Sequence, residues 1–276
     1  MSDAETPIPA ADLTTRFAMG VVLVAVALVA VYLGGWPFRI LVFCAAAVML
    51  LEWADMHRLP RVWAYVGIIM LAGNLLFLIE NIYPAADMEP EIDAATFAPA
   101  WAGFGWTILP AVLLGLVARR ATMAGGYLYI AIPAFALLVL NWARFDLVLW
   151  ILLVTWATDI FAYFAGRSIG GPKLAPRISP NKTWAGLVGG IAGAAAVGAL
   201  AAWYFGLGSP FLQVGAVMAV VAQAGDLYES WLKRRAGVKD SGTILPGHGG
   251  ALDRLDGLLP VTVATYALLV AGLWAG

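Results

Sequence analysis

The stretch WAGLVGGIAGAAAVGALAAWYFG (residues 184–206) decides the fold class, because it carries no charged residue over a length that crosses a bilayer. A transmembrane helix needs about 20 predominantly apolar residues. Its central run GLVGGIAGAAAVG (186–198) is rich in Gly and Ala. Small residues of this kind favour close helix packing, so we interpret the run as a packing face and not as a nucleotide-binding loop.

Apolar stretches of similar length lie on both sides of this one. The predicted spans are residues 17–35, 36–53, 62–82, 97–118, 125–143, 146–166, 184–206, 210–230 and 257–275. The 276-residue chain is 62% hydrophobic with a mean hydropathy of +0.86, whereas a soluble domain is roughly 45–50% apolar. We therefore expect an all-α, polytopic integral membrane protein with about nine transmembrane helices. The first span lies deeper in the chain than a cleaved signal peptide does. It also lacks the basic residues with which a signal peptide begins.

The single cysteine limits the chemistry of the chain. Cys44 lies within an apolar run, so neither an intramolecular disulfide nor a cysteine-rich metal site can form. Free cysteines are among the most buried residue types. We expect a buried, inert thiol.

The basic residues predict the orientation of the spans. With a cytoplasmic N-terminus and a periplasmic C-terminus, 14 of the 16 Lys and Arg residues fall inside, and only Arg39 and Arg144 fall outside. The loop between the third and fourth spans falls outside and is acidic instead. We assign Arg119 and Arg120 to topology alone. Losing or adding one span would reverse the charge pattern downstream of it.

Polar sequence is concentrated in two segments on the predicted cytoplasmic side. The first, RSIGGPKLAPRISPNK (167–182), is basic and contains the Gly and Pro residues that favour turns. The second, SWLKRRAGVKDSGTILPGHGGALDRLD (230–256), gathers cations, carboxylates and a Gly-Gly pair in a chain that is only 12% charged. Topology and anionic lipid binding need only charge, so this mixture indicates phosphate chemistry at a membrane surface. The predicted organisation is a set of N-terminal transmembrane helices (1–145) followed by a C-terminal catalytic half (146–276). The catalytic half contains two cytoplasmic loops, 167–183 and 231–256.

Acidic residues within the apolar spans are functional candidates by default. Asp226 and Glu229 lie three residues apart at the cytoplasmic end of the eighth span. We predict Asp226 to be a metal ligand, whereas Glu229 has the alternative of an ion pair with Lys233. Asp159, in the sixth span, has the alternative of pairing with an arginine inside the membrane.

A second acidic pair follows the Gly-Gly turn. Asp253 and Asp256 would share one face of a helix beginning near Gly250. We predict that both contact a metal ion or the nucleotide. The alternative is stabilisation of the helix N-terminus, which contributes about 1 kcal/mol.

The first polar segment contains a candidate phosphate site. Ser179 and Pro180 end an extended stretch, and Asn181 is placed to cap a helix that begins at Lys182. A helix N-terminus suits a phosphate, and the Lys adds a mobile positive charge; the alternative is a plain cap of the seventh span. In the second segment, His248 either bonds a phosphate or holds its turn.

These residues resemble two sequence blocks of the phosphatidate cytidylyltransferases, also called CDP-diacylglycerol synthases. In the C-terminal signature the matching residues are Ser230, Lys233-Arg234, Lys239-Asp240, Pro246, His248-Gly249-Gly250, Asp253-Arg254 and Asp256. In the upstream block and the lead into the signature they are Asp159, Ala162-Tyr163, Gly166-Arg167, Ser179-Pro180, Lys182-Thr183, Gly225-Asp226-Leu227 and Glu229. The resemblance covers about residues 150–260. The chain departs from it at Ala185, Ala251 and Gly257, where relatives often carry Glu, a larger aliphatic residue and Ser.

The resemblance implies the reaction of CTP with phosphatidate to give CDP-diacylglycerol and diphosphate, with Mg²⁺; the binding of a monovalent cation such as K⁺ is left open. It implies catalytic roles for Asp226, Lys239, Asp253 and Arg254. The implied substrate contacts are Ser179, Lys182, Ser230, Lys233, Arg234, His248, Gly249 and Gly250. The implied metal ligands are Asp226, Asp253 and Asp256.

Two other functions remain open at this point. A CTP-dependent lipid kinase would transfer the γ-phosphate to a lipid alcohol. A proton-coupled transporter would use Asp159, Asp226 and Glu229 as a relay, but it does not explain why the charge is concentrated on one side. The expected partners are CTP, phosphatidate and membrane lipids, with a homodimer compatible with the sequence and no nucleic acid indicated. The expected location is the bacterial inner (cytoplasmic) membrane.

Overall fold

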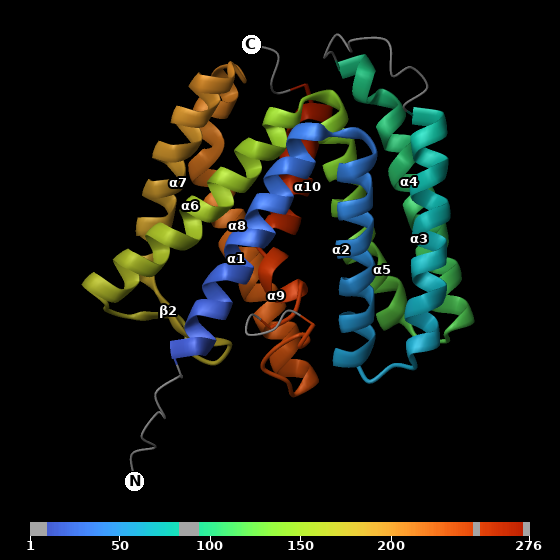
Figure 1. Cartoon of the computed structure of the whole chain (residues 1–276), viewed down its shortest axis with the longest axis horizontal. Coiled ribbons are helices and arrows are strands. Elements are labelled where there is room, and N and C mark those ends of the chain that lie inside the picture. The colour runs from blue at the N-terminus through green and yellow to red at the C-terminus, as the bar shows by residue number, and fades with distance from the viewer. Residues whose placement is uncertain (1–9, 83–93, 245–248, 273–276) are drawn as a thin grey trace.

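The computed structural model describes residues 10–82, 94–244 and 249–272, which form a bundle of long helices (Figure 1). The helices of the first half are α1 (Ala10–Leu33), α2 (Gly35–Met56), α3 (Arg61–Ile82), α4 (Ala94–Val117) and α5 (Ala121–Ala143). Those of the second half are α6 (Phe145–Ile169), α7 (Trp184–Phe205), α8 (Ser209–Ala236), α9 (Leu252–Leu255) and α10 (Leu258–Val270). Two strands, β1 (Lys173–Ala175) and β2 (Ser179–Thr183), lie between α6 and α7.

Long apolar helices make this a membrane protein of several spans. Within the described ranges, five helices are long and apolar enough to cross a bilayer, namely α2, α5, α6, α7 and α8. The helices α1, α3, α4 and α10 contain shorter apolar stretches: Gly20–Leu33, Arg61–Phe77, Gly105–Val117 and Leu258–Val270. Each of the predicted spans overlaps one of these helices. The polytopic helical class is therefore confirmed, whereas the count of nine spans stays a prediction.

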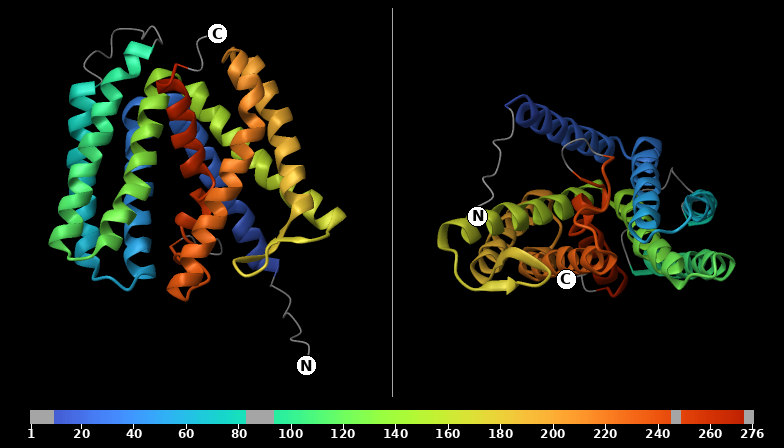
Figure 2. Two further views of the ribbon diagram at one scale, coloured as in Figure 1. Left: turned by 180° about the vertical axis from the view of Figure 1, so that it is seen from behind. Right: turned by 90° about the horizontal axis from the view of Figure 1, so that it is seen from below.

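The helices fall into two groups with α10 between them (Figures 1 and 2). On one side lie α2 to α5, on the other α6 to α8, and α10 contacts α5, α6 and α8. The start of α1, the β-hairpin and α9 lie at one end of the bundle, and α10 ends at the opposite end (Figure 1). The two polar segments of the sequence thus share one end of the molecule.

The glycine-rich run of α7 packs directly against α6, as its small residues predict. A Cβ atom on Gly189 would lie 2.2 Å from Cβ of Ala165, and one on Gly193 would lie 2.3 Å from ring carbons of Phe161. Both distances are far below van der Waals contact, so only glycine allows this approach of the two helices. Because α6 and α7 are held so closely, the hairpin that joins them is fixed at its base.

Two expectations are wrong in detail. The fold is not purely helical, because β1 and β2 pair antiparallel with Lys173 opposite Thr183 and Ala175 opposite Ser179. Cys44 is exposed on α2, not buried. Ile40, one turn earlier, is also exposed, so Cys44 lies on an apolar outer face. Such a face is stable against lipid, where burial in a protein core is not needed to remove an apolar side chain from water.

Candidate active site

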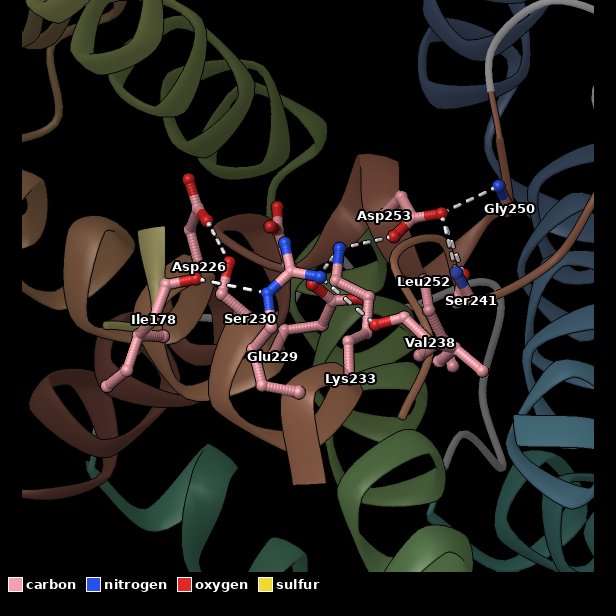
Figure 3. Close-up of polar contacts among 12 residues, drawn as sticks. Ile178, Asp226, Glu229, Ser230, Lys233, Val238, Ser241, Gly250, Leu252 and Asp253 are labelled. Carbon is pink, nitrogen blue, oxygen red and sulfur yellow. Dashed lines mark hydrogen bonds and ion pairs between the residues drawn. The ribbon is translucent and has the colours of Figure 1, made fainter. Parts of the chain in front are cut away.

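One polar face of α8 forms the centre of the candidate site. Gln223, Asp226, Ser230 and Lys233 recur at spacings of three and four residues, which places them on the same side of the helix. The Ser230 hydroxyl donates a hydrogen bond of 3.3 Å to Oδ1 of Asp226 (Figure 3). This face of α8 thus directs a row of polar side chains toward the hairpin and α9.

Lys182 of β2 joins the hairpin to this face. Its ammonium lies 2.5 Å from Oδ2 of Asp226 and donates a 3.0 Å hydrogen bond to Oε1 of the buried Gln223. The pairing brings the predicted phosphate-binding lysine and the predicted metal ligand together from segments 44 residues apart. Each neutralises the charge of the other.

The end of the hairpin corrects one predicted detail. The helix after it begins at Trp184, and Asn181 belongs to β2, so Asn181 is not the cap. Thr183 caps α7 instead, since its Oγ1 accepts a 3.0 Å hydrogen bond from the Gly186 backbone N–H. Lys182 therefore precedes the cap and points to Asp226 from an extended segment.

Lys233 forms a second charged cluster, on the next turns of α8. Its Nζ lies 2.6 Å from Oε2 of Glu229 and 2.6 Å from Oδ1 of Asp253 (Figure 3). The alternative reading of Glu229 as a partner of Lys233 is thus confirmed. Glu229 is buried, and neither of its oxygens receives a well-directed hydrogen bond from the described residues. The ion pair is what compensates its charge.

Asp253 holds the loop that follows α8. Its Oδ2 accepts hydrogen bonds from the Ser241 N–H (2.9 Å), the Ser241 hydroxyl (3.0 Å) and the Gly250 N–H (2.8 Å) (Figure 3). Burial raises the pKa of Asp253. The Lys233 ammonium and these backbone N–H groups lower it by more than burial raises it, so the pKa lies below the usual 3.8. The carboxylate stays charged, and both its oxygens already have donors.

The Gly-Gly pair fits this turn for steric reasons. Gly249 has a φ of +78°, which L-residues rarely adopt. A Cβ atom on Gly250 would lie 2.1 Å from Oγ of Ser241 and 2.7 Å from Oε2 of Glu52. The two glycines therefore let the loop backbone approach the carboxylates.

Glu52 reaches this loop from α2. It is only 1% exposed, and it accepts hydrogen bonds from the Ala251 N–H (2.8 Å), the Leu252 N–H (2.9 Å) and the Ser241 hydroxyl (3.2 Å). The N-terminal half of the chain thus contributes a buried carboxylate to the edge of the site.

Asp256 completes the acidic side of the site. Its Oδ1 accepts a 2.8 Å hydrogen bond from the Gly257 N–H. Burial, followed by the negative charges of Asp226 and Glu229, raises the pKa of Asp256 to about 8. Asp159 of α6 is near enough to act on it and on Asp226, yet forms no hydrogen bond with the described residues. A set of carboxylates that repel one another is suited to a cation.

The described carboxylates do not form a complete metal site by themselves. In the part of the chain that the structure describes, no three His, Cys, Asp or Glu side chains are grouped so as to hold a metal by themselves. Mg²⁺ usually takes one or two carboxylates and completes its octahedron with waters and phosphates. Asp226 and Asp256 offer hard oxygen ligands in that number.

The other predicted residues lie around this centre. Arg234 donates to the Ile178 carbonyl at 3.4 Å and to the Val238 carbonyl at 3.2 Å, so it links the hairpin to the end of α8. Lys239 and Arg254 are exposed, and the charge of Arg254 acts on Asp159. Ser179 pairs with Ala175 in the hairpin. His248 and Pro246 lie outside the described residues.

Sequence reasoning missed Glu52, Gln223 and Ser241. A signal existed for Glu52, because an ionisable residue within an apolar span is a functional candidate. The same rule selects Asp159, Asp226 and Glu229 in the sixth and eighth spans. Ser241 carries no such signal, since neutral polar residues are common in loops, and Gln223 lies within α8 but is not ionisable, so the rule does not select it.

Comparison with known proteins extends these local matches to the whole chain. A sequence model described as the cytidylyltransferase family matches residues 14–271. The chain is 35% identical over 270 residues to the phosphatidate cytidylyltransferase of Brucella abortus biovar 1 (strain 9-941), covering 92% of both chains. It is 35% identical over 265 residues to that of Bacillus subtilis (strain 168), covering 94% of this chain and 98% of the relative. Because these matches include α8, the hairpin and the loop around Asp253, this chain belongs to the cytidylyltransferase family.

Proposed function

We propose that this chain is a phosphatidate cytidylyltransferase, which converts CTP and phosphatidate into CDP-diacylglycerol and diphosphate. The observation that carries the proposal is the meeting of two cation–carboxylate clusters at one end of a membrane helix bundle. Lys182 pairs with Asp226, and Lys233 pairs with Asp253. Relatives that match nearly the whole chain carry the name of this enzyme.

The reacting groups require positioning more than a strong base. A phosphate monoester has a second pKa of about 6, so the lipid phosphate is largely a dianion at neutral pH and can attack without losing a proton to the protein. Attack on the α-phosphorus of CTP forms one P–O bond and breaks the bond to the β-phosphate oxygen, releasing diphosphate. The protein must bring two polyanions together, which calls for charge neutralisation.

We propose Asp226 and Asp256 as the carboxylates that hold Mg²⁺. When bound, Mg²⁺ supplies charge neutralisation and a template for the phosphate oxygens. Asp226 is at present balanced by Lys182. If Asp226 held a cation, that cation would balance its charge, and the Lys182 ammonium would then be available to a phosphate oxygen.

The third predicted metal ligand is Asp253, and that role stays a prediction. Its oxygens accept one bond from Lys233 and three from Ser241 and Gly250. We therefore propose that Asp253 holds the loop. Lys239, in the loop after α8, and Arg254, on α9, are exposed cations that then suit the departing diphosphate.

We also propose that the protein crosses the bacterial cytoplasmic membrane nine times, with the N-terminus inside. The start of α1 and the end of α10 lie at opposite ends of the bundle (Figure 1), which supports an odd number of spans. A reporter fused after Gly276 should be periplasmic and one inserted near Gly171 cytoplasmic. Finding both on the same side would contradict this topology.

Labelled CTP tests the reaction. With purified protein, phosphatidate and Mg²⁺, label in the α-phosphate of CTP should appear in the lipid and γ-label in free diphosphate. A lipid kinase would instead place γ-label in lipid and α-label in released CDP, and a transporter would leave both in CTP. Recovery of γ-label without α-label in the lipid fraction refutes the proposal.

A further inference from the structure

Glu52 is a buried carboxylate whose partners all belong to the loop at the candidate site. Its two oxygens accept hydrogen bonds from the Ala251 and Leu252 N–H groups and from the Ser241 hydroxyl. No Lys or Arg pairs with Glu52 among the described residues. Burying a carboxylate without a counter-ion is unfavourable unless several donors compensate its charge, so these contacts are specific features of the site.

The loop is built around this carboxylate. Gly250 and Gly242 have no room for a Cβ atom, which would lie 2.7 Å and 2.8 Å from Oε2 and Oε1 of Glu52. Ser241 places its hydroxyl between the two carboxylates, 3.2 Å from Oε2 of Glu52 and 3.0 Å from Oδ2 of Asp253. Both ends of the loop, near 241 and near 251, are therefore fixed by Glu52 from α2.

We propose that Glu52 is a positioning residue, which holds the two described ends of the loop, residues 241–244 and 249–252, for binding the phosphates of CTP. The inference rests on the proposed function, because that function assigns the loop to the nucleotide. Glu52 acts through the loop backbone and does not itself contact the substrate. The N-terminal helices thus take part in nucleotide binding and do more than anchor the enzyme.

The change Glu52→Gln is a sharp test, because it keeps the shape of the side chain. Oε1 and Oε2 each accept from a different backbone N–H. A glutamine has one carbonyl oxygen and one NH₂ group, so in either orientation an NH₂ faces a backbone N–H. At least one of these N–H groups, in a buried region, then loses its acceptor.

The expected kinetic result is a change that is selective for the nucleotide. Hydrogen bonds to charged groups contribute enough that KM for CTP should rise by about 10- to 100-fold. KM for phosphatidate should stay within about twofold, because the proposal assigns the loop to the nucleotide and not to the lipid. The matched control is Asp55→Asn on the same helix, since Asp55 pairs with Arg61 at 2.8 Å on the exposed surface. This control should keep both KM values.

A second readout follows the loop without turnover. Ala251 is only 8% exposed, so in a Cys44→Ala background an Ala251→Cys protein should react slowly with a maleimide. Adding Glu52→Gln should raise the labelling rate about tenfold or more, whereas adding Asp55→Asn should not. If the Glu52→Gln protein cannot be extracted folded, Ser241→Ala, which removes one donor to Glu52, should give smaller shifts in the same direction.

The outcomes separate this inference from the proposed function. An unchanged KM for CTP together with unchanged labelling overturns the role of Glu52 and leaves the enzymatic assignment standing. A general loss of kcat with both KM values and the labelling rate unchanged also overturns it. A wild-type protein that makes no CDP-diacylglycerol refutes the proposed function, while the labelling comparison still decides whether Glu52 holds the loop.

Discussion

Replacing Asp253 with Asn should separate a loop-holding role from a metal-binding one. The carboxylate accepts four hydrogen bonds, from Lys233 on one oxygen and from Ser241 and Gly250 on the other. An Asn side chain has one acceptor oxygen, so its NH₂ must face either the ammonium or the backbone donors. The substitution therefore loses one side of the network in either orientation.

The size of the effect follows from burial and from the remaining partner. The side chains of Asp253 and Lys233 are 10% and 12% exposed, so solvent screens the pair only slightly. A hydrogen bond to a charged group contributes about 1.5–3 kcal/mol. Lys233 keeps Glu229 at 2.6 Å, which places the loss near 2 kcal/mol and predicts about a 30-fold fall in kcat/KM.

The assay is cytidylyl transfer from α-labelled CTP, measured over a range of Mg²⁺ concentrations. If Asp253 holds the loop, the loss should persist at every Mg²⁺ concentration. Activity within about threefold of wild type would refute the argument from the hydrogen bonds. Recovery at high Mg²⁺ would show instead that Asp253 is a metal ligand, as first predicted from the sequence.

Three further outcomes test the site and the packing. Asp226→Asn should lower turnover by about 100-fold or more, because Asn keeps the shape but loses the charge that a hard cation needs. Turnover of the Arg119→Gln control should stay within about twofold of wild type, and near-normal turnover of the Asp226→Asn protein with moderate Mg²⁺ would remove Asp226 from the metal site. The pKa of Asp256 is raised to about 8, so below that pH a metal ion must displace the proton of the carboxyl group. Mg²⁺ affinity measured between pH 6.5 and 8.5 should therefore rise with pH, by up to about tenfold per pH unit. Asp256→Asn should give a flat profile, and a flat profile of the unchanged protein would count against Asp256 as a metal ligand. Gly193→Val should reduce the yield of folded protein in detergent, because the new Cβ would lie 2.3 Å from the Phe161 ring; an unchanged yield and melting temperature would contradict the close packing of α6 and α7.

The sequence predicted the helices well because apolar length is a local property. Every predicted span overlaps a helix, yet α8 continues from the predicted end at 230 to Ala236. Its last turn carries Lys233, Arg234 and Arg235. Their low hydropathy ended the predicted span before them, although cations stabilise the C-terminus of a helix. The strands β1 and β2 were missed because three and five residues in a basic, Pro-containing segment show no alternating pattern.

The site was predicted in its members but not in its pairings. The Gly-Gly pair, Lys182 and the carboxylates of Asp226, Asp253 and Asp256 were found from residue type and spacing, whereas Glu52 was not. The partner of each depends on tertiary packing, so neither the bond from Lys182 to Gln223 nor the four bonds to Asp253 could be read from the chain. The contact of Glu52 with Leu252 crosses 200 residues, and no local pattern reports such a distance.

The order of Glu52 and its partners along the chain has a consequence for biosynthesis. Chains are made from the N-terminus at roughly 5–20 residues per second, so Glu52 emerges roughly 10–40 s before its partner Leu252, 200 residues later. Lys233 likewise precedes Asp253. The loop is thus translated after the helices that carry Glu52 and Lys233. Until Leu252 has been translated, the nascent chain holds a carboxylate whose backbone donors are still missing, so the proposed nucleotide site cannot form before that point.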